Sequence, residues 1–123
     1  MEKNIKVLVV EPNKLPYEKV IKNKLEEKQK IVDGLIEYVS LDNNSLLVCN
    51  EEGKILGMEP NRIVGGDIIA GTFFIVRDSL GTGEDVSLNE NQIERFKIQF
   101  GKDSILEMNL KLFKLMREKN LEM

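Results

Sequence analysis

The stretch Asp67-Ile68-Ile69-Ala70-Gly71-Thr72-Phe73-Phe74-Ile75-Val76 decides the fold of this chain. Both of its alternating sets of side chains are apolar, so we predict an inner strand from Ile68 to Val76 that is buried on both faces. Gly71 within this strand indicates a β-bulge or the close approach of another backbone. A second apolar run covers residues 45–49, and the polar segment between the two runs suits either a small ligand pocket or a pair of β-turns.

Outward from this strand, apolar spacing predicts the remaining elements. Further strands are predicted at residues 5–10, 35–41, 46–49 and 54–56, the last as the return strand of a hairpin. Helices are predicted from Tyr17 to Ile31, after a capping-box pattern at residues 87–90, and from Ser104 to about Lys119. This order predicts an α+β domain: a mostly antiparallel sheet with an N-terminal strand-helix-strand unit and with C-terminal helices covering one face.

Composition makes a non-enzymatic protein the expectation. The 123 residues contain no histidine and a single cysteine, Cys49, so there is no imidazole base, no Cys-His nucleophile and no zinc ligand set. Gly81-Thr82-Gly83 lacks the Lys-Ser/Thr ending of a phosphate-binding loop. We therefore expect neither an enzyme nor a bound cofactor or metal.

Charge and hydropathy patterns bound the partners and the location. The net charge of -3 weighs against a nucleic-acid partner, which normally selects a basic patch. No apolar run approaches the roughly 20 residues of a membrane span, and the N-terminus leads directly into a strand. The sequence predicts a protein of the bacterial cytoplasm without a membrane partner.

Several phrases of the sequence resemble a known family. They are KVLVVEP at residues 6–12, VDGLIE at 32–37, VCNEEGK at 48–54, PNR at 60–62, DIIAGTFFIV at 67–76 and VSL at 86–88. In this order they resemble an uncharacterised family, domain of unknown function 3846, carried by phages, plasmids and integrative elements of Gram-positive bacteria. The resemblance implies a small accessory protein of a mobile element. It gives one α+β domain at residues 1–101 and leaves 102–123 as a helical extension, part of that domain or an oligomer interface.

The candidate ligand-binding residues are Asn50, Glu51, Lys54, Asn61, Arg62 and Tyr17. Arg62 offers a planar fork of donors for a phosphate or carboxylate, and Asn61 offers a donor and an acceptor for a base edge. We expect both to share one polar surface with the hairpin at residues 50–54, while the ring of Tyr17 can stack on a purine. The alternatives are structural: an ion pair of Arg62 with a glutamate, a solvated hairpin and a half-buried Tyr17.

The last predicted helix carries more apolar surface than one domain needs. One stripe comprises Ile105, Met108, Leu112, Leu115 and Met116, and a second comprises Leu106, Leu110 and Phe113. Together they span roughly 240° of the helix, whereas a stripe of about 100° or somewhat more suffices for docking on one core. The sequence therefore predicts a homo-oligomer through this helix, and the alternative is a docking surface for a host protein.

These observations lead to three functional hypotheses. The first is a non-enzymatic, phage-type counter-defence protein that binds and sequesters a small host molecule, with a nucleotide signal as the expected ligand. The second is a protein-binding inhibitor or adaptor of a host defence or restriction protein, which an exposed apolar or acidic patch would favour. The third is a carboxylate-metal enzyme, which would need a divalent ion held by at least two of Glu51, Glu52, Glu59 and Asp67.

Overall fold

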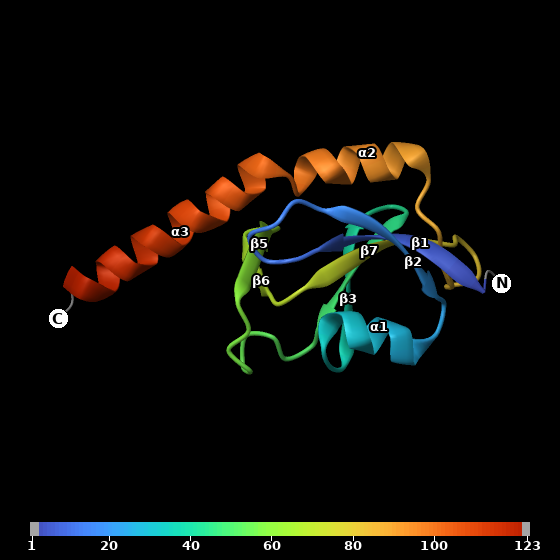
Figure 1. Ribbon diagram of the computed structural model, residues 1–123, viewed down its shortest axis with the longest axis horizontal. Coiled ribbons are helices and arrows are strands. Elements are labelled where there is room, and N and C mark those ends of the chain that lie inside the picture. Colours follow the sequence, from blue (N-terminus) through green and yellow to red (C-terminus); the bar gives the residue numbers. More distant parts are fainter. Residues whose placement is uncertain (1–2, 122–123) are drawn as a thin grey trace.

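The computed structural model describes residues 3–121 and confirms an α+β fold with a mostly antiparallel sheet (Figure 1). The main sheet has the order β2-β1-β7-β4-β3, and the short β8 also pairs with β7. Its strands are β1 (Asn4–Val10), β2 (Tyr17–Lys22), β3 (Ile36–Asp42), β4 (Ser45–Asn50), β7 (Phe73–Asp78) and β8 (Asp85–Val86). A separate hairpin consists of β5 (Pro60–Val64) and β6 (Asp67–Ala70), and the helices are α1 (Leu25–Val32), α2 (Glu90–Gln99) and α3 (Lys102–Leu121).

The sheet has a core on each face. On one face Leu8, Leu47, Phe73 and Ile75 pack against Ile93, Phe96 and Phe100 at the C-terminal end of the domain. On the other face Val7, Val48, Phe74 and Val76 pack against Val32 of α1. Figure 1 shows the result, with α1 and α2 on opposite sides of the sheet. The predicted covering of the sheet by Ile93, Phe96 and Phe100 is confirmed, and α1 covers the face that this prediction left open.

The predicted inner strand is confirmed for its second half only. β7 lies in the middle of the main sheet, between β1 and β4. The chain passes from the β5–β6 hairpin into the main sheet at Gly71, just before β7. Gly71 has a φ of 86°, which residues with a side chain rarely adopt. Residues 67–70 pair with β5 instead. The apolar run is therefore divided between two sheets: its residues in β7 are buried from Phe73 to Val76, whereas Ile68 and Ile69 in β6 are half-buried.

The predicted helix from Tyr17 to Ile31 is wrong in its first half. Residues 17–22 form β2, which pairs antiparallel with β1 from Val9↔Tyr17 to Asn4↔Lys22. Of these six side chains only that of Ile21 is buried, since β2 is an edge strand whose backbone pairing with β1 does not require an apolar side-chain period. The helix itself starts at Leu25.

Two local predictions at loops also differ from the structure. Residues 54–56, predicted as a return strand, belong to a turn segment over residues 51–57, with Ile55 and Leu56 exposed. The capping box of α2 is formed by Asn89 and Gln92, two residues beyond the predicted start of the motif. The later position of the capping box leaves the predicted apolar stripe of α2 unchanged.

The long helix α3 is joined to the domain only at its beginning. Met108 is buried and Ile105 and Leu112 are half-buried where α3 packs along β5. The rest of the helix extends away from the domain, as Figure 1 shows. No helix within residues 3–121 is both long and apolar enough to cross a membrane.

Candidate functional site

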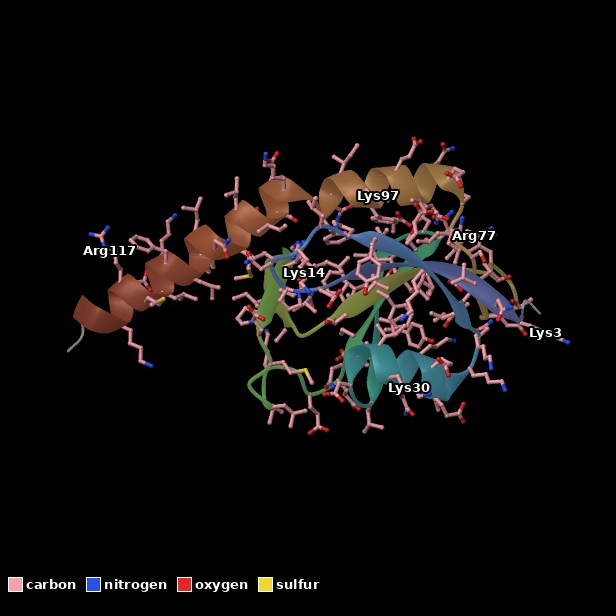
Figure 2. All side chains as sticks on the ribbon, in the orientation of Figure 1. Lys3, Lys14, Lys30, Arg77, Lys97 and Arg117 are labelled. Carbon is pink, nitrogen blue, oxygen red and sulfur yellow. The ribbon has the colours of Figure 1, made fainter. Side chains whose placement is uncertain are left out.

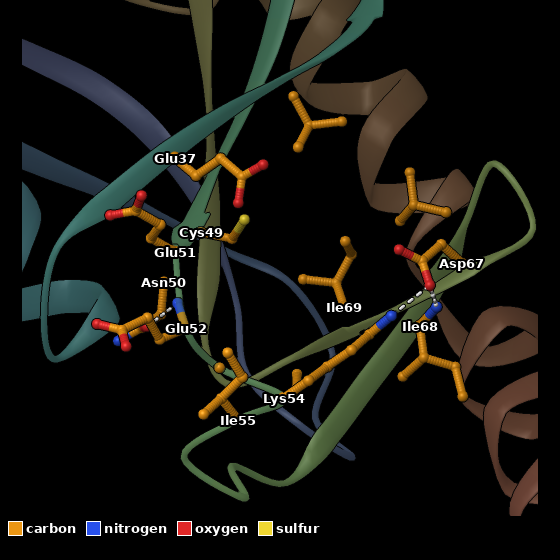
Figure 3. A pocket seen from close by; sticks show the side chains of 14 residues that line it. Glu37, Cys49, Asn50, Glu51, Glu52, Lys54, Ile55, Asp67, Ile68 and Ile69 are labelled. Atoms are coloured by element: carbon orange, nitrogen blue, oxygen red, sulfur yellow. Dashed lines mark hydrogen bonds and ion pairs between the residues drawn. The ribbon is translucent and has the colours of Figure 1, made fainter.

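An open pocket of about 360 Å³ lies between the main sheet and the β5–β6 hairpin (Figure 3). We call it the hairpin pocket; its walls are β3, the end of β4, the 51–57 turn segment and β6. Its apolar side chains are those of Val39, Cys49, Ile55, Val64, Ile68, Ile69 and Ala70, Val64 coming from β5. The volume falls within the usual range for small-molecule sites, which is about 300–1,000 Å³.

Strand alternation decides which side chains of β3 face the hairpin pocket. Glu37 and Val39 line it, whereas Tyr38 between them points to the α1 face of the sheet. Cys49 lies opposite Glu37 in the antiparallel register of β3 and β4, so it lines the pocket as well. The pocket is therefore an extension of the core that α2 covers, at the end of the sheet that the hairpin covers instead.

The charges of the hairpin pocket are mostly negative. Glu37, Glu51, Glu52 and Asp67 contribute four carboxylates, and Lys54 contributes the one ammonium group of the lining. Lys54 reaches across the opening to form an ion pair with Asp67, as Figure 3 shows, and this hydrogen bond lowers the pKa of the Asp67 carboxyl. The three glutamates have no ion-pair partner within residues 3–121. The lining thus favours groups that donate hydrogen bonds or carry positive charge.

A close backbone contact fixes one wall of the pocket. Gly53 is buried, and a Cβ atom at this position would lie 2.5 Å from the carbonyl oxygen of Ala70. The 51–57 turn segment can approach β6 this closely only because residue 53 has no side chain. The glycine of the sequence phrase NEEGK therefore shapes the pocket.

Of the predicted site residues, Asn50, Glu51 and Lys54 line the hairpin pocket. The Asn50 side chain is already engaged, since its Nδ2 donates to the carbonyl oxygens of Val32 and Asp33, each at 3.1 Å, and its Oδ1 accepts from the Glu52 amide at 2.7 Å. Asn50 thus anchors the end of α1 to the start of the turn segment. Glu51 and Lys54 are exposed, and ligand binding by them stays a prediction.

Arg62 does not face the hairpin pocket, so the predicted polar surface that it shares with the hairpin is wrong. Its side chain is fully buried, and its three nitrogens donate to backbone and side-chain oxygens from four segments of the chain. The shortest of these hydrogen bonds go to the carbonyl oxygen of Lys14 and to Asn61 Oδ1, both at 2.7 Å, and to Ser104 Oγ at 2.8 Å, and the carbonyl oxygen of Phe100 accepts at 3.0 Å. Burial lowers the pKa of the guanidinium. Among the described residues, Arg62 also forms no ion pair with Glu51 or Glu59, the glutamates of the alternative interpretation.

Asn61 is buried beside Arg62 and has a comparable role. Its Nδ2 donates to the carbonyl oxygens of Val10 at 2.8 Å and Gly71 at 2.9 Å, and its Oδ1 accepts from Arg62 Nη1 at 2.7 Å. The side chain thereby joins β5 to the end of β1 and to the break before β7. Pro60 and Asn61 are the first two residues of β5.

Tyr17 lies at the opposite edge of the main sheet from the hairpin pocket. It is in β2, and the pocket is lined by β3 and β4 at the other end of the strand order. The structure therefore brings three of the six candidates together at one pocket and places the other three elsewhere. Sequence reasoning missed Glu37, whose carboxylate faces the pocket (Figure 3), because a single glutamate in an alternating strand carries no distinctive signal.

Two features bear on chemistry in the pocket. Burial, followed by the nearby carboxylate of Glu37, raises the pKa of the Cys49 thiol to about 11, so the thiol is protonated at neutral pH and is a poor nucleophile. Within residues 3–121, no group of three or more carboxylate or cysteine side chains is placed to hold a metal ion. Neither a reactive thiolate nor a metal-binding cluster is thus present among the described residues that line the pocket.

A buried polar cluster that the sequence did not reveal lies on the α1 face. The Asp85 carboxylate accepts from Lys28 Nζ and from the Tyr38 hydroxyl, both at 2.6 Å. Lys28 and Asp85 are buried, and the cluster joins α1, β3 and β8. These residues are far apart in the sequence and belong to no motif. The bonds are all within the domain, which indicates a structural role.

The buried polar cluster predicts that part of the free energy of unfolding depends on pH. Burial, followed by the hydrogen bond to Asp85, raises the pKa of Tyr38 above its ordinary value of about 10. A group whose pKa is raised in the folded state stabilises the fold fully below its unfolded pKa. This contribution is lost as the pH rises from the unfolded pKa through the folded pKa. We expect Tyr38→Phe to be less stable than the wild type at pH 7, and the difference to shrink above about pH 10.

Urea unfolding at pH 7, 9, 10 and 11 would measure this convergence. Tyr17→Phe is the matched control, since Tyr17 lies at the other sheet edge and outside the cluster. Its difference from the wild type should change less over the same range. A Tyr38→Phe difference that is constant with pH would contradict the prediction.

The chain belongs to the family of the domain of unknown function DUF3846, whose model matches residues 5–101. The match spans both sheets, α1 and α2 and ends just before α3 begins. No curated protein and no solved structure is detectably similar to the chain. The geometry of the sites therefore has to carry any functional argument.

Proposed function

We propose that this protein is a non-enzymatic binding protein that captures a small molecule in the hairpin pocket. The observation that carries the proposal is the combination of an apolar lining with a rim of carboxylates in an open pocket of suitable size. The apolar part can take up the body of a ligand, while the carboxylates accept hydrogen bonds and thereby fix its orientation.

The charges specify the chemistry of the ligand. Glu37, Glu51 and Glu52 repel a phosphate, whereas amino groups, amidines and amino-bearing bases offer the N–H donors that carboxylates accept. A nucleotide signal, the ligand expected from the sequence, would have to enter with its base first and keep its phosphates outside. We propose a ligand whose entering end carries amino groups.

The biological role that we propose is sequestration of a small host molecule by a mobile element, as a form of counter-defence in the host cytoplasm. It rests on the resemblance of the sequence phrases to proteins of phages, plasmids and integrative elements. Sequestration requires a pocket and no catalysis, which is consistent with a lining that offers carboxylates, one paired lysine and a protonated thiol.

Native mass spectrometry of the protein purified from its host would test the pocket. We expect a co-purifying small molecule that denaturing extraction releases. Isothermal titration with the released molecule should then show binding that Glu37→Gln weakens about tenfold, since a hydrogen bond to a charged group contributes about 1.5–3 kcal/mol.

A matched variant separates pocket effects from general charge effects. Glu26→Gln removes one exposed carboxylate of α1, which does not line the pocket, and should leave the affinity unchanged. Absence of any bound molecule, or an affinity that Glu37→Gln leaves unchanged in a folded variant, would contradict the proposed function.

The second candidate function is a protein-binding inhibitor or adaptor of a host defence or restriction protein. The observation that favours it is the apolar surface of α3, on which Leu106, Leu110 and Phe113 are exposed. This candidate and a homo-oligomer need the same surface of the helix. The oligomeric state in solution therefore decides between them.

A further inference from the structure

Five exposed residues form a regular line along α3, which we call the outer seam. They are Asp103, Leu106, Leu110, Phe113 and Arg117, at successive spacings of three, four, three and four residues. This alternation is the heptad spacing with which one helix packs against another. Leu106, Leu110 and Phe113 have exposed fractions of 55%, 61% and 60%, so the apolar centre of the seam is uncovered.

The domain does not occupy the outer seam. α3 packs on β5 through Ile105, Met108 and Leu112, and these residues lie roughly 120–180° around the helix from the centre of the seam. Figure 2 shows the end of α3, with Arg117, extending beyond the body of the domain with its side chains directed into open space. A partner helix can therefore approach the seam along its length, which is about 21 Å from Asp103 to Arg117.

The sequence of the outer seam is complementary to itself in one orientation. If two copies of α3 lie antiparallel about a two-fold axis at Leu110, residues whose numbers add up to about 220 lie across from each other. Asp103 then faces Arg117 of the second copy, and Leu106 faces Phe113. Glu107 and Lys114, which flank the seam on one side, also face each other in this register.

Parallel pairing would place each charge against its own copy, so Asp103 would face a second Asp103 and Arg117 a second Arg117. Within residues 3–121, the ion pairs of the chain involve none of Asp103, Glu107, Lys114 and Arg117. These four charges are thus available to a partner, and their order along the helix fits an antiparallel copy of the same helix.

We propose that the outer seam is the interface of an antiparallel homodimer, in which the α3 helices of two chains pair about a two-fold axis at Leu110. The interface is isologous, so each complementary charge pair occurs twice. The inference is independent of the hairpin pocket, whose lining includes no residue of α3. It assigns the exposed side chains of Leu106, Leu110 and Phe113 to contacts with a second copy of the chain.

Sedimentation velocity over a range of protein concentrations tests the proposal on the full chain. We expect a monomer–dimer equilibrium that Leu110→Lys abolishes. Glu107→Lys or Lys114→Glu alone should raise the dimer dissociation constant about tenfold, since each reversal replaces two attractive exposed pairs by two repulsive ones. The double variant Glu107→Lys/Lys114→Glu should restore the wild-type constant.

The charge exchange distinguishes the antiparallel copy from every other occupant. In a parallel dimer each reversal replaces one like-charge pair by another, so neither single variant should weaken the dimer, and a heterologous partner has no matching exchange. Weakening in both single variants followed by restoration in the double variant therefore occurs only in the proposed arrangement. Circular dichroism checks that each variant keeps the helix. A wild-type chain that stays monomeric at tens of micromolar, or a double variant that is not restored, would overturn the proposal. If the chain were a monomer that binds a ligand in the hairpin pocket, the dimer proposal would be wrong and the proposed function would still be supported.

Discussion

Replacement of Arg62 by alanine should lower the free energy of unfolding by about 3–5 kcal/mol. The guanidinium is fully buried and donates hydrogen bonds to oxygens of Lys14, Phe100 and Ser104 as well as to Asn61. Alanine would leave these buried acceptors without donors and would create a cavity. Phe100 is also the C-cap of α2, where a positive charge is favoured by the helix dipole.

Two further variants make this prediction specific. Arg62→Lys should recover only a small part of the loss, because one ammonium group cannot reach oxygens on several sides of a planar fork. Arg95→Ala is the matched control: Arg95 is exposed, and its ion pair with Asp42 at 2.9 Å should contribute less than about 1 kcal/mol. Urea unfolding measures all three. An Arg62→Ala variant as stable as Arg95→Ala would contradict the structural role.

Arg62 also shows where sequence reasoning about the site reached its limit. An Arg in a polar phrase between strands predicts either a ligand or a carboxylate partner, because these are the partners that a sequence can suggest. Its actual partners are mostly backbone carbonyls, at Glu11, Lys14 and Phe100, and any residue type supplies a carbonyl. The role of Arg62 is thus set by which loops the fold brings together.

The predictable parts of the fold are the elements whose buried positions require apolar residues. β7 begins with four consecutive buried apolar residues, as an inner strand requires, and α2 carries buried apolar residues at helical spacing. β2 carries no such period, since only Ile21 is buried, and its strand conformation comes from pairing with β1. Pairing partners in the sheet are long-range information that a local pattern does not contain.

The hairpin pocket was predictable in part for a related reason. The phrase from Asn50 to Lys54 indicated a loop at a site, and the structure places it on the pocket wall. Glu37 comes from β3, and it reaches the same pocket only because β3 pairs with β4 in a register that sets Glu37 opposite Cys49. A site assembled from non-adjacent segments is visible only once the register is known.

Substitution of either central phenylalanine by alanine should cost about 3–5 kcal/mol. The loss is expected at both positions, Phe73 and Phe74, because neither side chain is exposed. Phe73 packs against Phe100 on the α2 face, with ring centroids 5.4 Å apart. Phe74 belongs to the separate core under α1.

Because the two rings lie on opposite faces and share no core cluster, their effects should add. The double variant would then lose about 6–10 kcal/mol, which exceeds or equals the stability of many single domains, and should be unfolded at 25 °C by circular dichroism. Phe113→Ala is the control of the same residue type; its ring is exposed, and in a monomer at low concentration it should change stability by less than about 0.5 kcal/mol. If one of the two single variants lost almost nothing, the sheet would carry only one core, and the packing of α1 or α2 against it would have to be wrong.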